Sequence, residues 1–134
     1  MRFEVFKKVL WRKADYLALS TDARLLFLWS WTNPDVGACG LYRASVRQLE
    51  DALGESPGAA PARERVGVAL RELAEKPHVL YDDEAEVLWV VAKAKHADRS
   101  EAARDLMRRE ARRCPPTPLK DEFRRLYDRR LELS

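Results

Sequence analysis

Two arginines near the start of one expected helix have the clearest chemistry in the chain. The amphipathic pattern between Pro61 and Lys76 predicts a helix, with Arg63 and Arg65 in its first turns. A guanidinium group can donate two parallel hydrogen bonds to the O6 and N7 atoms of guanine in the major groove of DNA. We therefore expect Arg63 and Arg65 to read base edges. Further candidates for DNA contact are the basic residues Arg43, Arg47, Arg71, Lys76, Lys93 and Lys95.

A solvated helix face is the alternative interpretation of the same helix. Glu64 with Arg71, and Glu72 with Lys76, could form ion pairs on its outer side. The second pair has the favourable i,i+4 spacing. Charged residues that neutralise one another in this way would have no role in binding.

Catalytic and metal chemistry find no support in the sequence. The two cysteines and two histidines, at positions 39, 114, 78 and 96, lack the close paired spacing of a zinc site. The five glycines form no phosphate-binding loop. No Ser/His/Asp or Cys/His grouping is evident either. We expect a protein that is not an enzyme and needs no cofactor or metal.

Local signals predict the elements that must position the basic residues. Ser20 is a good N-cap for an apolar helix that Asn33-Pro34 ends. A short strand over Leu41 to Arg43 follows, and then Ser45 and Gln48 form a capping box that opens a second helix. A short helical piece precedes the apolar helix, and its expected packing residues are Trp11, Tyr16, Leu17 and Leu19.

Arg43 and Arg47 bracket the start of the helix that the capping box opens. Because a helix N-terminus attracts anions, the two arginines could join it in a phosphate contact. Plain surface charge is an equally good interpretation of both.

The helix from Pro61 to Lys76 is followed by a hairpin. His78 to Tyr81 and Glu86 to Val91 have the composition of two short strands, joined by an acidic turn. The order helix, strand, helix, helix, hairpin predicts a mainly α fold with a small β-hairpin. We expect a winged helix-turn-helix domain over residues 1–96. The buried stripe of its third helix would be Val66, Ala69, Leu70 and Leu73.

Residues 97–134 are expected to form a charged, helical C-terminal extension. The apolar residues of its last helix recur at helical spacing, so they form one stripe that needs a covering surface. Packing back onto the domain is the simpler interpretation, and a dimer contact or a partner groove is the sharper alternative, in which the stripe would bind a partner. The stripe consists of Leu119, Phe123, Tyr127 and Leu131.

The net charge of +3 is unevenly distributed along the chain. Residues 1–13 have five cations against one acid, residues 14–96 nine against thirteen, and residues 97–134 eleven against eight. Nonspecific DNA affinity rises with the number of phosphates that cations neutralise. We therefore expect phosphate contacts from the two basic arms. The acidic turn of the hairpin is expected to avoid DNA or to meet a basic partner protein.

The compartment is predicted from the cysteines and from hydropathy. Two cysteines 75 positions apart fit a reducing cytosol better than a disulfide framework. No apolar run approaches the ~20 residues that a membrane span needs. The N-terminus has no continuous hydrophobic region of a signal peptide. We expect a cytoplasmic protein with no membrane partner.

Three runs of the sequence resemble a known group of proteins. They are LSTDARLLFLWSWTNPDVGACGLYRASVRQLEDALG, RVGVALRELAE and VLYDDEAEVLWVV. Together they are similar to the N-terminal winged-helix domain of phage-type replication initiators, the DnaD-like replisome organisers and related phage replication proteins. The similarity covers roughly residues 10–95. Its matching positions are Ala23 to Leu28, Thr32-Asn33-Pro34, Gly40, Tyr42, Leu49, Gly54, Val66, Ala69-Leu70, Leu73, Tyr81-Asp82 and Trp89.

The resemblance and the expected fold imply binding to double-stranded DNA, in phage-type replication initiation or transcription regulation. Replication proteins and a second copy of the chain are further expected partners. The rival hypothesis is a protein-interaction or dimerisation module of a replisome-like assembly that does not bind DNA directly. It would dock through the acidic turn and the C-terminal stripe.

Overall fold

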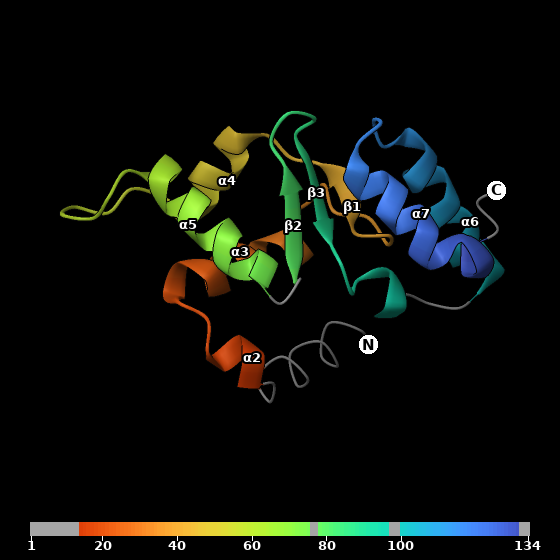
Figure 1. Cartoon of the computed structure of the whole chain (residues 1–134), viewed down its shortest axis with the longest axis horizontal. Helices are drawn as coiled ribbons and strands as arrows, with labels where there is room; N and C mark the ends of the chain where they lie inside the picture. Colours follow the sequence, from red (N-terminus) through yellow and green to blue (C-terminus); the bar gives the residue numbers. More distant parts are fainter. Residues whose placement is uncertain (1–13, 76–77, 97–99, 132–134) are drawn as a thin grey trace.

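The computed structural model describes residues 14–75, 78–96 and 100–131. Within them the chain is mainly helical, with one small antiparallel sheet (Figure 1). Trp11 and Lys76 lie outside the described residues. The elements are α2 (Ala14–Leu17), α3 (Thr21–Thr32), β1 (Leu41–Arg43), α4 (Val46–Leu53), α5 (Ala62–Glu75), β2 (Val79–Asp82), β3 (Val87–Val90), a 3₁₀ turn η1 (Ala94–His96), α6 (Glu101–Arg113) and α7 (Pro118–Leu131).

The helix boundaries follow the predicted caps. The Ser20 side chain accepts a hydrogen bond from the backbone of Ala23 at the start of α3. Ser45 and Gln48 form the expected capping box at the start of α4, and Gly54 follows the end of that helix. These caps satisfy backbone donors that would otherwise lack partners.

Asn33 ends α3 and ties it to β1. Its side-chain amide donates to the Trp29 carbonyl at 2.9 Å and to the Tyr42 hydroxyl at 2.7 Å. Tyr42 in turn donates to the Ser30 carbonyl at 2.8 Å. Desolvation of this buried hydroxyl raises the pKa of Tyr42. The Asn33-Pro34 signal in the sequence therefore belongs to a buried hydrogen-bond network that joins a helix end to the sheet.

The three strands are arranged in the order β1-β3-β2, with antiparallel pairing throughout. The central strand β3 is buried along its whole length because helices cover both faces of the sheet. Leu88 and Val90 join the core formed with α3, α4 and α5, whereas Val87 and Trp89 join the core formed with α6 and α7. Figure 1 shows the two groups of helices on opposite sides of the strands.

Gly40, just before β1, is required by the close approach of the chain to β3. Its φ is +77°, and a Cβ atom there would lie 2.7 Å from the Val90 carbonyl oxygen. Its own carbonyl accepts a hydrogen bond from the Val90 backbone at 2.8 Å. A side chain at this position would therefore disturb the junction between β1 and β3.

The C-terminal stripe was a candidate partner-binding surface, and that interpretation is wrong for this fold. Phe123, Tyr127 and Leu131 are buried, and Leu119 is partly buried against the same core. The Phe123 ring meets Trp89 edge-on at 6.1 Å between centroids. The stripe packs against the face of the sheet that α3, α4 and α5 leave open, as the simpler interpretation predicted.

A smaller correction concerns Leu17, which was expected to be a packing residue. Its side chain is 46% exposed in the short helix α2, whereas Tyr16 beside it is buried. The Tyr16 ring meets Phe27 of α3 edge-on at 6.0 Å between centroids. One turn of helix can direct only part of its apolar residues into the core.

Candidate nucleic-acid interface

Helix α5 is held in place by one face and leaves the other open. Its buried residues pack against α3 and α4. They confirm the predicted stripe, with Leu70 only partly buried at its edge. The side chains that remain on the exposed outer face are Arg63, Glu64, Val68, Arg71, Ala74 and Glu75.

Arg65 does not belong to this outer face, so its expected role as a base-reading residue is corrected. Its Nε and Nη2 atoms donate to the two carboxylate oxygens of Asp22, at 3.0 and 2.8 Å, and Nη1 donates to the Gly54 carbonyl at 2.7 Å. Only 14% of the side chain is exposed. Arg65 therefore joins α5 to the first turn of α3 and to the end of α4.

The sequence contained a signal for this inward position. Residue 65 lies three positions after Ala62 and four before Ala69, and both alanines are buried. Such spacing places a residue along the edge of the buried stripe. The hydrogen bond from Arg65 lowers the pKa of the Asp22 carboxyl, although desolvation acts in the opposite direction.

Glu72 has a similar structural contact. Its carboxylate accepts a hydrogen bond from the Ser20 backbone at 2.7 Å, at the N-cap of α3. The predicted partner Lys76 lies outside the described residues. The other predicted ion pair, Glu64 with Arg71, is not formed among the described residues.

Arg63 and Arg71 are the exposed cations of the outer face. Neither forms an ion pair or a side-chain hydrogen bond with another described residue. Val68 lies near them on the same helix and is 51% exposed. The face therefore offers two guanidinium groups and one apolar side chain to an approaching molecule, together with the carboxylates of Glu64 and Glu75.

Arg43 and Arg47 are both exposed at the junction of β1 and α4. The N-terminus of α4 is already capped, since the Ser45 hydroxyl accepts from the Gln48 backbone at 3.1 Å. The Gln48 side chain also donates to the Asp35 carboxylate at 3.1 Å. A phosphate at this helix end would meet an occupied donor and a nearby negative charge, so the geometry favours surface charge for the two arginines.

The two lysines after the hairpin differ in their surroundings. The Lys93 ammonium group lies 5.0 Å from the centroid of the Trp31 ring, which is a cation–π contact. Lys95 is exposed in η1. Only Lys95 therefore extends into solvent as the prediction required.

The acidic turn between β2 and β3 is held from within and from α7. Asp82 accepts hydrogen bonds from the backbones of Glu84 and Ala85, at 3.0 and 3.3 Å. The hydroxyl of Thr117, at the start of α7, donates to the same carboxylate and lowers its pKa. Asp83 and Glu84 are exposed at the tip. The tip therefore presents negative charge and is anchored to the C-terminal helices.

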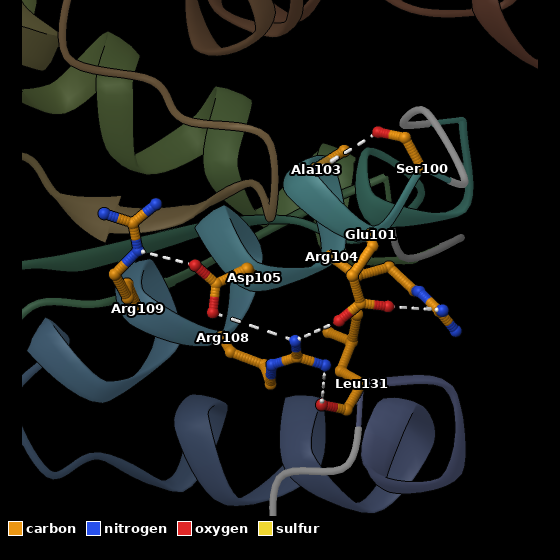
Figure 2. A network of polar contacts seen from close by, with 8 residues as sticks. All are labelled: Ser100, Glu101, Ala103, Arg104, Asp105, Arg108, Arg109 and Leu131. Carbon is orange, nitrogen blue, oxygen red and sulfur yellow. Dashed lines mark hydrogen bonds and ion pairs between the residues drawn. The ribbon is translucent and has the colours of Figure 1, made fainter.

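Three of the five arginines of α6 pair with acids of the same helix (Figure 2), whereas Arg112 and Arg113 in its last turn are exposed without an ion pair to another described residue. Glu101 accepts hydrogen bonds from Arg104 at 2.7 Å and from Arg108 at 2.8 Å. Arg109 pairs with Asp105 at 3.3 Å. Arg108 also donates to the Leu131 carbonyl, at 3.2 Å, which links α6 to α7. This arm has less cationic charge to offer to phosphates than its composition suggested.

The described residues 14–75, 78–96 and 100–131 bring together no three His, Cys, Asp or Glu side chains that could hold a metal ion. Cys39 and Cys114 are free thiols in the core. Burial raises the pKa of Cys39 to about 12, so this thiol stays protonated at neutral pH. Within the same described ranges, no helix is both long enough and apolar enough to cross a membrane.

Comparison of the chain with protein-family models, with curated proteins and with solved structures found no match in any of the three.

Proposed function

We propose that the protein is a winged helix-turn-helix protein that binds double-stranded DNA through the outer face of α5. The element order α3, β1, α4, α5, β2 and β3 supports the first half of this proposal. The sheet order supports it as well, since β1 pairs with the second strand of the hairpin. In such a fold, α5 would be the recognition helix and the acidic turn between β2 and β3 would be the tip of the wing.

The observation that carries the proposal is the state of Arg63 and Arg71. Both are exposed on a helix whose other face is buried, and neither has an acidic partner among the described residues. Guanidinium groups in this setting can donate to guanine or to phosphate. Val68 lies between them in sequence, where an apolar side chain can contact the methyl group of thymine.

The acidic wing limits how the DNA can lie. Asp83 and Glu84 at its tip would repel phosphates, so the wing is not part of the proposed contact. The α6 arm is also a weak source of phosphate contacts over most of its length, because Arg104, Arg108 and Arg109 are paired there. Arg112 and Arg113, in its last turn, are the exposed exceptions. We infer a contact limited to α5 and the residues next to it, with a moderate dependence of affinity on salt.

The resemblance of residues 10–95 to phage-type replication initiators supports a role in replication initiation or transcription regulation. Replication proteins and a second copy of the chain remain proposed partners. The rival hypothesis, an interaction module without DNA binding, depended in part on the stripe of α7. Because Phe123 and Tyr127 are buried there, that stripe offers no docking surface in this fold.

The test is fluorescence anisotropy of the full chain with labelled random-sequence duplex and single-stranded DNA, at low and moderate salt. We expect salt-sensitive binding to the duplex. The double variant Arg63→Ala/Arg71→Ala should weaken it by about tenfold or more, which corresponds to the loss of one or two good contacts.

The matched control is Arg109→Ala/Arg125→Ala, which removes the same charge from exposed ion pairs of α6 and α7. Its affinity should stay close to that of the unchanged protein. Equal losses in the two double variants would mean that only net charge matters. Absence of duplex binding at low salt, with a dimer or larger assembly by light scattering, would favour the rival hypothesis.

A further inference from the structure

Gly67 lies in the interior of α5, between the two arginines of the outer face. Glycine is the least favourable residue for a helix interior after proline, because it loses the most backbone freedom on folding. A glycine in the middle of a helix therefore needs a reason, which lies either in the fold or in something that approaches the helix.

The fold gives no such reason at Gly67. Its φ is not in the left-handed region, which among the described glycines is adopted by Gly40, Gly54 and Gly58. The nearest atom to a Cβ built at position 67 is Nη1 of Arg71, at 3.7 Å, an ordinary van der Waals distance. By contrast, a Cβ at Gly40 would lie 2.7 Å from a backbone oxygen. An alanine would fit at position 67 without displacing its surroundings.

The neighbours of Gly67 indicate what approaches it. The Arg71 guanidinium group lies beside this bare stretch of backbone, and Arg63 is one turn away toward the start of the helix. Both cations are exposed and have no acidic partner among the described residues. Val68, next in sequence, is half exposed. Two cations on either side of a missing side chain suit a polyanion that comes close to the helix backbone.

We infer that double-stranded DNA makes its closest approach to the protein at Gly67, so that the absence of a side chain there determines affinity. This inference rests on the proposed function and adds to it the point of closest contact. The backbone of α5 can then approach the floor of the groove, where Arg71 donates to a base edge and Val68 lies beside it. A methyl group at position 67 would hold the helix away from the DNA and lengthen these contacts.

The experiment compares Gly67→Ala with Ala102→Gly in the full chain. Ala102 is exposed in the first turn of α6, outside the proposed contact, so the second variant makes the opposite exchange on another helix. Melting temperature and duplex affinity by anisotropy are measured for both. We expect Gly67→Ala to raise the melting temperature and to weaken duplex binding by about tenfold, the loss of one good contact. Ala102→Gly should lower the melting temperature and leave the affinity within about twofold, because α6 is outside the proposed contact.

The possible results separate the inference about Gly67 from the proposed binding of duplex DNA. If the unchanged protein binds duplex and Gly67→Ala binds it equally well, the inference is overturned and the proposed function stands. If Gly67→Ala melts at a lower temperature, the glycine is needed by the fold and the inference is again wrong. If the unchanged protein fails to bind duplex at low salt, the proposed function fails and the inference fails with it. If Gly67→Ala reduces self-association and leaves DNA binding unchanged, the glycine serves a contact between copies of the chain.

Discussion

Helices α5 and α6 both carry surface arginines, but α6 pairs three of its five with its own acids, whereas Arg63 and Arg71 of α5 have no acidic partner among the described residues. On α6 the acids precede their partners, with Glu101 before Arg104 and Asp105 before Arg109. That orientation is the favourable one for ion pairs along a helix. On α5, Glu75 follows Arg71 at the same spacing, and no ion pair forms between them. The comparison indicates that the positions of the acids along a helix, and not only their number, affect which cations stay available for binding.

We expect α6 and α7 to contribute to stability by packing against the sheet, in contrast to the binding role proposed for α5. The variant Phe123→Ala should show the largest effect. The ring is fully buried and contacts Trp89 and Tyr127, with centroid distances of 6.1 and 4.9 Å. Its removal should lower the free energy of unfolding by about 3–5 kcal/mol, as for other buried aromatic residues. Denaturant titration measures the loss. A loss below about 1 kcal/mol would mean that α7 contributes little to the fold.

The contrast between the two arginines of the first turns of α5 is tested by Arg65→Ala against Arg63→Ala. Arg65→Ala should lower the melting temperature, because it breaks the bonds to Asp22 and Gly54. At temperatures well below unfolding it should bind duplex as well as the unchanged protein. Arg63→Ala should show the opposite pattern, with unchanged stability and weaker binding. If Arg65→Ala abolishes binding in the folded state, Arg65 contacts DNA after all.

The ion pair between Arg65 and Asp22 makes the stability of the protein depend on pH. Asp22 has a lowered pKa in the folded state, first because Arg65 donates to its carboxylate. Its contribution to stability is therefore fully present above the unfolded-state pKa of about 3.9 and is lost as pH falls through the lower, folded value. The difference in melting temperature between the unchanged protein and Arg65→Ala should shrink below about pH 4. A difference that stays constant down to pH 2 would show that the carboxylate is not involved.

The smallest expected effect concerns the acid on the α5 surface itself. Glu64 is exposed on the same face as the two arginines, and its charge opposes the approach of phosphate. Glu64→Gln should raise affinity for random duplex about two- to fivefold at low salt, and the gain should fade as salt increases. Glu84→Gln at the wing tip is the control and should change affinity less. Equal gains from both would place the wing beside the DNA.

Most of the fold could be predicted because its signals are local. The caps at Ser20 and Ser45, the stop at Asn33-Pro34, and the strands of the hairpin all depend on residues a few positions apart. The position of Arg65 could not be predicted in the same way, because its partner Asp22 is 43 residues away. A pairing at that distance depends on how the helices pack.

The sequence also contains a signal for the burial of the α7 stripe. Residues 87–90 read VLWV, which is apolar at every position, and a strand of this kind needs a cover on both faces. The helices before it can cover only one face. The amphipathic last helix was the available cover for the other, so the two patterns taken together favour packing within the chain over a partner groove.

The burial of β3 on both faces affects how the protein folds while it is being synthesised. A ribosome completes the sheet and its first helical cover before it synthesises residues 118–131. A nascent chain that has not yet reached Phe123 therefore exposes the Val87 and Trp89 side of the sheet, a surface prone to association with other chains. Folding of this side finishes only when α7 has emerged from the ribosome, so the emergence of α7 is the step that protects the sheet.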